Sequence, residues 1–488
     1  MGAWPALTYE VPALAQRLLG DTFFAEAIFS VGLLAFALAL TARTATELAG
    51  KASAAFVAVA TLFASTKLYG YSKVLVFAVA AALFVRYARQ PTRARAAQLA
   101  VWSAAAFLFR HDFLIYLAVP TAILVLLGTP GWREAFDRLL IYGGTLALLL
   151  AGPVYSVQHY VGLGSYLETA RALVAQEANR TTFRWPHFGP APGGIWSFLF
   201  EEGNAVAWLY DVSIAIPIVA LLVLVGSPRG KDLDARQTRA VIASLAVLAL
   251  ILDRFFLRNN FGARFGDLGA PIAILAAWLP SRFQDSARWL RALVWTTTVL
   301  VAVPTLVALS TTGSVWRELD TSGLSDSGKK VGRRLVAVTN ELRALPAPAA
   351  AVDPEPNAAE YLRVCTASTD RVLVVADAPE ILAIAGRSFA GGHPTFRPGF
   401  YTLEGDQQQT LERMRLESIP VVLLDDEHSY SSHFVPQFRR IHEYVMSAYE
   451  RAGVLPAPAG PPVQVWTMRG RAAAGHYRMT GLPCFSVR

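Results

Sequence analysis

Three short clusters of charged and aromatic residues interrupt long apolar stretches of this sequence. Ionisable side chains at membrane depth are costly, and for that reason they usually have a function. Arginine is well suited to bidentate contacts with phosphate oxygens. The clusters therefore predict a basic cavity at the level of the lipid headgroups, which would bind a lipid phosphate or diphosphate. Their members are Lys67, Tyr71 and Lys73; Arg110, His111 and Asp112; and Asp253, Arg254, Arg258, Arg264 and Asp267.

The clusters also have a simpler interpretation, which is anchoring at the membrane interface. Lys67 and Lys73 fit it, because basic side chains extend toward the headgroups and tyrosines collect at the same depth. The run Arg110-His111-Asp112 fits it less well. Three ionisable groups in one tight reversal need mutual pairing or a wet cavity.

The stretches between the clusters predict a polytopic α-helical membrane protein. The chain has 488 residues, of which 54% are hydrophobic and 16% are charged, whereas a soluble domain carries about 25% charged residues. We predict about ten membrane spans. Eight is the alternative, because several runs are shorter than the roughly 17–25 residues that cross a hydrocarbon core. The runs lie at 22–42, 52–66, 74–87, 97–109, 113–128, 138–157, 205–226, 238–253, 268–280 and 291–309.

The distribution of basic residues predicts the orientation. Arg and Lys are densest in the short loops at 43–51, 86–95, 133–138, 229–239 and 282–291, and such loops are typically cytoplasmic. The three clusters and the C-terminal part then lie outside. Because most of the net charge of +8 sits in these loops, it argues against nucleic-acid binding. The Ala/Arg/Leu-rich composition favours a bacterial inner membrane as the location.

The sequence divides into three parts. Residues 1–21 are predicted as a polar outer loop, 22–309 as the transmembrane domain, and 310–488 as an extracytoplasmic α/β domain, in which a small sheet is covered by helices. We predict a helix at 329–345, strands at 371–376, 421–424 and 463–468, and helices at 380–385, 407–416 and 436–451. Cys365 and Cys484 both fall in this part. They form either one disulfide or two unrelated buried thiols.

The layout and three local motifs resemble the GT-C superfamily of polytopic glycosyltransferases, specifically its bacterial Rgt-like and protein-mannosyltransferase-like members. The resemblance implies transfer of a sugar from a polyprenyl-phosphate donor to a lipid, glycan or protein acceptor on the outer face of the cytoplasmic membrane. The motifs are Tyr69-Gly70-Tyr71-Ser72-Lys73, Phe107-Leu108-Phe109-Arg110-His111-Asp112, and Phe255-Phe256-Leu257-Arg258 with Ala263-Arg264-Phe265-Gly266-Asp267.

Site residues follow from the motifs. Arg110, Arg258 and Arg264 are predicted to contact the donor phosphate. The donor site would be lined by Tyr71, Lys73, His111, Asp112 and Asp267. The sequence assigns no catalytic residue, no metal ligand and no certain cofactor, although a divalent metal is compatible with the resemblance.

The resemblance breaks down at the N-terminus. Members of the GT-C superfamily usually begin with a further transmembrane helix, followed by an outer loop that carries an acidic catalytic residue. Residues 1–21 match only the end of such a loop. We expect either a start further upstream, which gives a hexosyl- or pentosyltransferase, or an inactive binding relative. A lipid or solute transporter is the remaining alternative, although the spans show no internal repeat of the kind that transporters often have.

Overall fold

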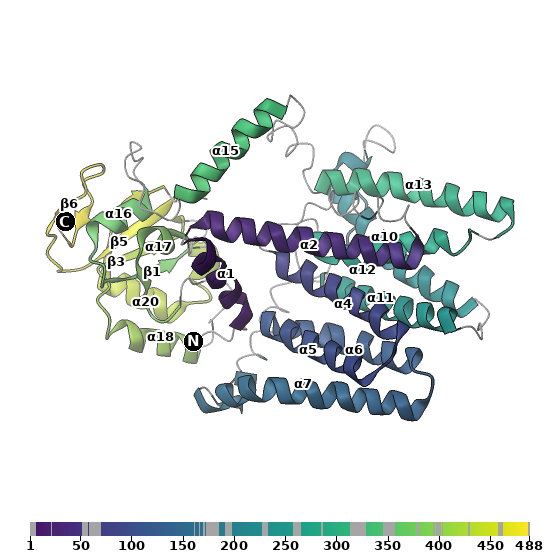
Figure 1. Ribbon diagram of the computed structural model, residues 1–488. Helices are drawn as coiled ribbons and strands as arrows, with labels where there is room; N and C mark the ends of the chain where they lie inside the picture. The colour runs from purple at the N-terminus through teal and green to yellow at the C-terminus, as the bar shows by residue number, and fades with distance from the viewer. Residues whose placement is uncertain are drawn as a thin grey trace.

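The computed structural model describes residues 6–20, 22–50, 57, 70–160, 162–164, 166–168, 171, 185–190, 198–226, 233–256, 265–284, 286–312, 328–344, 357–376, 380–393, 396, 402, 404–427, 430–456 and 462–486. It consists of a helical bundle followed by a smaller strand-containing domain (Figure 1). The bundle helices are α1 (Ala6–Leu19), α2 (Phe23–Ala49), α4 (Tyr71–Arg89), α5 (Arg93–Phe109), α6 (His111–Gly128), α7 (Trp132–Tyr160), α10 (Glu202–Gly226), α11 (Leu233–Phe256), α12 (Phe265–Ser281) and α13 (Arg288–Thr312).

Within the described residues, seven helices are long and apolar enough to cross a membrane. They are α2, α4, α6, α7, α10, α11 and α13. Helix α12 has a shorter apolar stretch, Gly269–Ser281, and α5, predicted as the span at 97–109, has 17 residues. The predicted run at 52–66 lies outside the described residues except for Val57. The run at 22–42 begins at Thr22, the N-cap of α2, and every other predicted run falls inside a longer helix, so polar ends extend the short runs.

Burial separates the inner helices from the outer ones. Two thirds of the apolar window of α4 is buried, against 11% for α7 and for α13. Helix α4 contacts α2, α5, α6, α11 and α12, and its Phe77 packs edge-on against Phe113 of α6 with ring centroids 5.5 Å apart. The apolar surfaces of α7 and α13, which include Trp132, Leu148 and Trp289, are exposed. A helix that exposes large apolar side chains over its length is typical of a lipid-facing position.

The prediction of a loop at residues 1–21 is wrong over most of its length. Ala6–Leu19 form helix α1, which contains Pro12 and contacts α2 and α5. Pro12 removes one intrahelical hydrogen bond, so the local sequence favours a loop here. The apolar residues Leu7, Val11 and Ala15 recur every fourth position, however, and they pack on the bundle. Tertiary packing therefore stabilises a helix that the local sequence disfavours.

The C-terminal domain has a five-stranded mixed sheet in the order β2-β1-β3-β5-β4. Its strands are β1 (Arg371–Val375), β2 (Ser388–Phe389), β3 (Val421–Leu424), β4 (Tyr449–Leu455) and β5 (Val463–Met468). Strand β1 is parallel to β2 and β3, whereas β5 is antiparallel to β3 and β4. The central strands β1 and β3 are buried on both faces, as their unbroken apolar sequences require.

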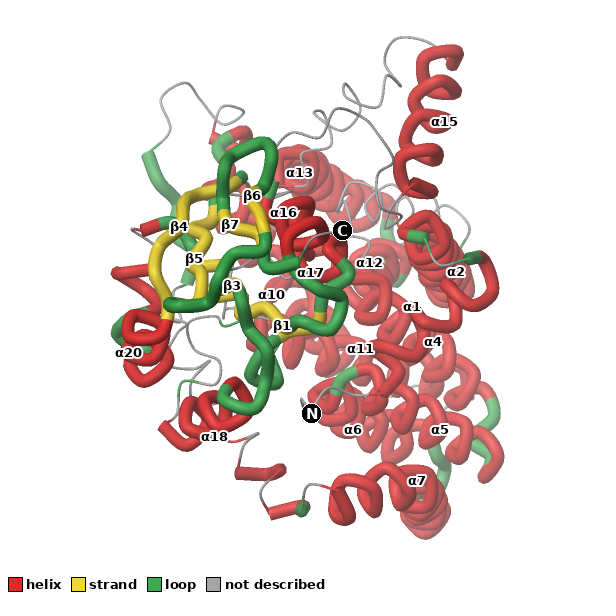
Figure 2. The backbone as a smooth tube through the Cα atoms, turned by 90° about the vertical axis from the view of Figure 1, so that its left-hand side faces the viewer, coloured by secondary structure: helices red, strands yellow, loops and turns green. Residues whose placement is uncertain are grey.

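Helices cover both faces of this sheet. One hydrophobic cluster joins it to α16 (Ala358–Cys365) and α17 (Glu380–Ala385), and the other joins it to α18 (Glu404–Met414), the π-helical turn Tyr430–Phe434 and α20 (Arg439–Ala448). Figure 2 shows the sheet with these helices around it, next to the ends of the bundle helices. The predicted layout of a small sheet covered by helices is confirmed.

Two parts of the domain differ from the sequence prediction. The helix predicted to reach residue 451 ends at Ala448, and Tyr449 begins strand β4, because main-chain pairing with β5 overrides the helical pattern. The short strands β2, β6 (Gly475–His476) and β7 (Pro483–Cys484), together with α16, are not predicted. Strands of two residues carry too little sequence pattern to be recognised.

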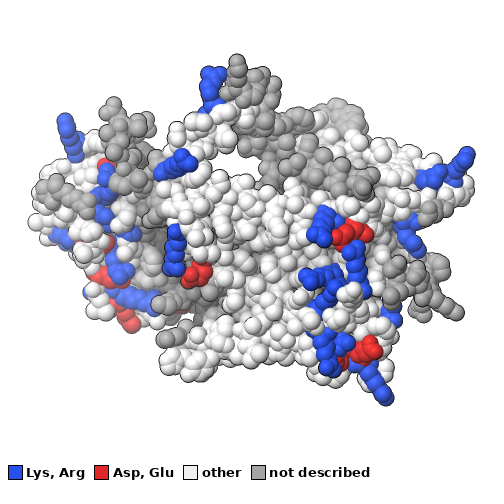
Figure 3. Space-filling view, viewed as in Figure 1, with Lys and Arg blue, Asp and Glu red and all other residues white. Residues whose placement is uncertain are grey.

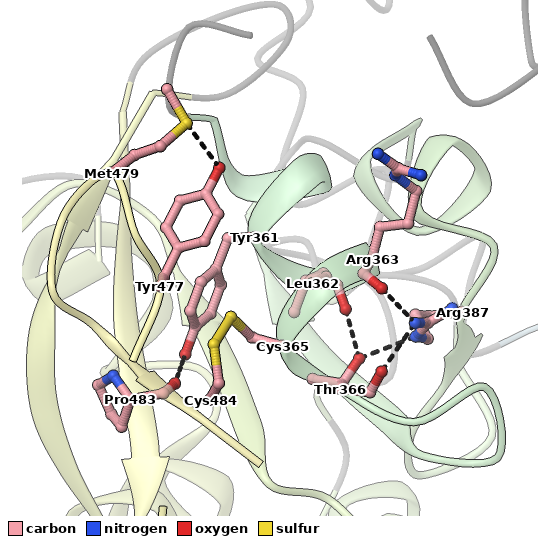
Figure 4. Close-up of a disulfide and its surroundings, with 10 residues drawn as sticks. All are labelled: Tyr361, Leu362, Arg363, Cys365, Thr366, Arg387, Tyr477, Met479, Pro483 and Cys484. Atoms are coloured by element: carbon pink, nitrogen blue, oxygen red, sulfur yellow. Dashed lines mark hydrogen bonds between the residues drawn. A yellow bond between two sulfur atoms is a disulfide. The ribbon is translucent and has the colours of Figure 1, made fainter. Parts of the chain in front are cut away.

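A disulfide links Cys365 at the end of α16 to Cys484 of β7, with Cα atoms 4.2 Å apart (Figure 4). Next to it the buried Arg387 donates to the Thr366 hydroxyl and to the carbonyls of Arg363 and Thr366, all at 2.8 Å. A buried guanidinium needs such a complete set of acceptors. The disulfide holds the last strand of the domain against its first helix, and the Arg387 network holds the turn after α17 against the end of the same helix.

Candidate functional site at the domain end of the bundle

The bundle has two chemically different ends. Helices α2, α4, α6, α10 and α12 begin at the end next to the strand domain, and helices α5, α7, α11 and α13 run back to it (Figure 1). A dense patch of Lys and Arg lies at the opposite end (Figure 3). There Arg93 forms a bidentate pair with Asp137, at 3.1 and 2.8 Å, and Arg89 pairs with Glu47 at 3.1 Å. The basic loops therefore lie at one end, and the strand domain lies at the other.

The run Arg110-His111-Asp112 lies at the domain end, where α5 turns directly into α6. Arg110 is the one residue between the two helices, and its backbone is extended. Its Nε and Nη2 donate to the two carboxylate oxygens of Asp112, at 3.1 and 2.6 Å. The Tyr116 hydroxyl donates to the same carboxylate at 2.8 Å. Asp112 also lies in the first turn of α6, where the helix dipole favours a negative charge.

The pairing restricts what Arg110 can do. Its side chain is 39% exposed, and that of Asp112 is 31% exposed, so the pair lies at an accessible surface and not in the core. The guanidinium carbon lies 5.0 Å from the ring centroid of Phe113. A phosphate that binds here would share the guanidinium with Asp112, so Asp112 sets the orientation in which Arg110 meets an anion.

His111 connects this cluster to the long segment between α7 and α10. The Tyr166 hydroxyl lies 2.7 Å from Nδ1 of His111 and 3.2 Å from Nε2. Burial raises the pKa of Tyr166, so the phenol stays protonated and can donate to an unprotonated ring nitrogen. Phe107 of α5 also packs on this residue, with its ring centroid 4.5 Å from that of His111. The imidazole thus contacts two aromatic rings.

A second part of the same segment is docked on α10. The main-chain N–H of Gly189 donates to Oδ1 of Asn204 at 2.6 Å, and Nδ2 of Asn204 donates to Glu201 at 2.7 Å. The indole N–H of Trp185 donates to Asp211 at 3.1 Å, and its ring packs edge-on against Tyr210 at 4.7 Å. These contacts hold residues 185–190 against the domain end of α10.

Asp253 of α11 is the most unusual residue near this end. Its side chain is 1% exposed, and Oδ1 accepts a hydrogen bond from Ser213 of α10 at 2.9 Å. Its Oδ2 has no hydrogen-bond partner among the described residues. Ser213 and Asp211 were not singled out from the sequence, although both are polar residues inside the apolar run 205–226, which was the signal that could have found them.

The structure places the predicted site residues in three different ways. Arg110 and Asp112 form an ion pair, and His111, between them in the sequence, is hydrogen-bonded to Tyr166. Tyr71 and Lys73 lie in the first turn of α4, which contacts both α5 and α6, but Tyr71 is buried in the bundle core. Arg258 and Arg264 lie outside the described residues, and Asp267 lies in the first turn of α12 without a described side chain. Their predicted role in phosphate binding stays a prediction.

The described residues hold no group of three or more His, Cys, Asp or Glu side chains arranged to bind a metal ion.

The bundle and the domain together define a polytopic α-helical membrane protein with a C-terminal α/β domain. No protein-family model matches the chain, and no curated protein sequence matches it. Among solved structures it is similar to the Archaeoglobus fulgidus oligosaccharyltransferase in the apo form, at 12% sequence identity and a TM-score of 0.44. The match covers 94% of this chain and 66% of the oligosaccharyltransferase, so the chain spans slightly less than two thirds of that protein's length.

Proposed function

We propose that this protein is a GT-C-like membrane glycosyltransferase of the bacterial inner membrane. It transfers a sugar from a polyprenyl-phosphate donor to a lipid, glycan or protein acceptor outside the cytoplasm. The donor phosphate lies at the domain end of the bundle, at Arg110 and at the predicted contacts Arg258 and Arg264. The C-terminal domain faces the same side.

One observation carries the proposal. One of the three motifs, Arg110-His111-Asp112, lies at the start of α6, at the domain end of the bundle. There the partly exposed Arg110 is paired with Asp112, which also accepts from Tyr116, and His111 is hydrogen-bonded to Tyr166. The basic loops, which are typical of the cytoplasmic side, lie at the opposite end. A lipid-linked anion on the non-cytoplasmic side would therefore meet Arg110, which is oriented by Asp112 and accessible to a headgroup.

The chemistry follows from the proposed donor. The bond between the anomeric carbon and the phosphate oxygen breaks, and polyprenyl phosphate leaves with the bonding electrons. An acceptor oxygen forms the new bond to the same carbon and gives its proton to a base. Arginine contacts stabilise the charge that grows on the leaving phosphate, which is a main contribution to such reactions. Because Arg110 is held by Asp112, little reorganisation is needed during the transfer.

A matched pair of variants tests this assignment. Arg110→Ala and Arg93→Ala each remove an arginine that pairs bidentately with an aspartate, but at opposite ends of the bundle. We expect Arg110→Ala to reduce transfer from a labelled polyprenyl-phosphate sugar by roughly a hundredfold or more, the size expected for losing one charge-stabilising donor. Arg93→Ala should keep wild-type transfer. Equal rates in the two variants would remove Arg110 from the site.

Arg258→Ala and Arg264→Ala extend the test to the two other predicted phosphate contacts. Each should abolish donor-dependent transfer while the protein still purifies as a folded species with an unchanged melting temperature. Wild-type transfer in both variants would confine phosphate binding to the start of α6.

A further inference from the structure

Helix α15 (Gly328–Ala344) contacts α2, but it also exposes apolar side chains. Leu335 is 66% exposed and Val338 is 40% exposed. With Val331 and Leu342 these residues follow the spacing of three and four that places side chains on one side of a helix. Figures 1 and 2 show that the first turns of α15 project away from both the bundle and the sheet. A soluble helix of this length would not leave such a stripe in water.

Apart from Val336, which is 59% exposed, the rest of α15 is polar and strongly basic. Arg333 and Arg334 are both exposed. The sequence of the helix holds one acidic residue, Glu341, against five basic ones: Lys329, Lys330, Arg333, Arg334 and Arg343. A narrow apolar stripe flanked by Lys and Arg is typical of a helix that lies in the interface of a membrane and not of one that crosses it.

Both ends of α15 are tied to the ends of candidate membrane spans. At its C-terminal end the Arg343 guanidinium lies 4.6 Å from the ring centroid of Phe24, in the first turn of α2. At its N-terminal end, residues 313–327 connect it to Thr312, the last residue of α13. The start of α2 and the end of α13 lie on the domain side of the bundle (Figure 1). Helix α15 therefore lies on that side.

We propose that α15 lies on the membrane leaflet at the domain end, with Leu335 and Val338 among the acyl chains near the headgroups. Arg333 and Arg334 bind anionic lipid headgroups. The partner is a lipid surface because the helix combines a basic composition, an uncovered apolar stripe and two connections to span ends. Bound in this way, α15 limits how far the strand domain can move from the membrane, since the domain begins within 15 residues of its end.

Single-cysteine labelling of the full-length protein in lipid nanodiscs tests this proposal. The two native cysteines are paired in a disulfide, so an introduced cysteine can be labelled selectively under non-reducing conditions with the environment-sensitive fluorophore NBD. Leu335→Cys reports on the apolar stripe. Ala337→Cys, which is also exposed and points to the opposite side by helical geometry, is the matched control.

We expect NBD at position 335 to emit at shorter wavelength than NBD at 337, and to be quenched strongly by nitroxide lipids labelled high on the acyl chain. NBD at 337 should emit as it does in water. The double variant Arg333→Glu/Arg334→Glu should weaken the quenching at 335 in nanodiscs with anionic lipid and have little effect in neutral nanodiscs. A water-like signal at 335, or an apolar signal there that lipid nitroxides do not quench, would overturn the proposal. The second result would mean that the stripe is covered by protein.

Discussion

Arg110 and Arg93 form the same kind of ion pair with an aspartate, but the two pairs have different roles because they lie at opposite ends of the bundle. Each binds one aspartate through two nitrogen atoms. Arg93 joins the start of α5 to α7 in the basic patch. The partner of Arg110 lies only two residues away and is also held by Tyr116. The first pair ties helices together, whereas the second fixes the direction of one guanidinium at the proposed donor site.

Asp112→Asn tests this positioning role. The variant loses the ionic attraction and replaces one acceptor oxygen with a donor, so one of the two bonds to Arg110 is lost. Hydrogen bonds to charged groups contribute about 1.5–3 kcal/mol, and we therefore expect kcat/KM for the labelled donor to fall roughly tenfold or more. Asp137→Asn, which disturbs the Arg93 pair in the same way, should leave kcat/KM unchanged. A similar loss in both variants would indicate a general effect on folding.

The buried carboxylate of Asp253 affects the stability of the bundle. Its Oδ2 is buried without a described partner, and an isolated buried carboxylate is costly. Asparagine can still accept from Ser213 and carries no charge. We expect Asp253→Asn to unfold at the same temperature as the wild type or higher in thermal melts of the detergent-solubilised protein, whereas Ser213→Ala should lose about 1 kcal/mol. A lower melting temperature for Asp253→Asn would show that the charge itself is needed.

At the scale of elements, the sequence predicts the helices and strands that have a clear apolar pattern of their own. It misses those that form because they pack against another element. The apolar runs mark the bundle helices because each must avoid water over its full length. Strands β1, β3 and β5 are likewise predicted, since their apolar runs are buried. Helix α1 and strand β4 depend on packing or pairing with other elements, which the pattern within one segment cannot reveal. The Arg110-His111-Asp112 run was identified from its charges, but Tyr166, 55 residues away, was not.

The glycine turn after β2 gives the α/β domain a pH-dependent element. Burial, with the nearby positive charge of Arg413, lowers the pKa of His393 to about 4. Its ring packs edge-on against Phe396. A Cβ on Gly392 would lie 2.3 Å from Nη1 of Arg413, and its φ of +84° also favours glycine. The turn therefore holds a neutral histidine next to a cation.

This arrangement predicts acid sensitivity of the domain. Unfolded His393 binds a proton below its ordinary pKa of 6.5, whereas the folded residue does so only near pH 4. Unfolding thus takes up a proton in this window, and stability falls as the pH drops from about 6.5 to about 4, by at most about 1.4 kcal/mol per pH unit. Hydrogen exchange of the full-length protein, corrected for intrinsic rates, should show earlier opening of β2 and α18 at pH 5 than at pH 7. His393→Gln should reduce this difference; an unchanged pH dependence in that variant would exclude His393 as its source.

At the scale of the whole molecule, the two ends of the bundle carry different features. One end collects the basic loops and their ion pairs. The other carries the strand domain, the interfacial helix α15, the docked segment 185–190 and the Arg110 cluster. Sequence could predict this polarity because loop charge and cluster position are both local properties. It could not predict how the long segment between α7 and α10 is fixed, since single contacts such as Asn204 with Gly189 depend on the folded bundle.

The most direct measurement follows both halves of a labelled donor in sealed proteoliposomes that contain the wild-type protein. The donor is a polyprenyl phosphate with tritium in the sugar and carbon-14 in the lipid, and a native membrane extract supplies the acceptors. Our account predicts that tritium moves to an acceptor while carbon-14 remains in polyprenyl phosphate, on the side that faces the strand domain. If both labels crossed the bilayer together with the bond between them intact, the protein would be a transporter. If the donor bound but neither label moved, it would be a binding protein.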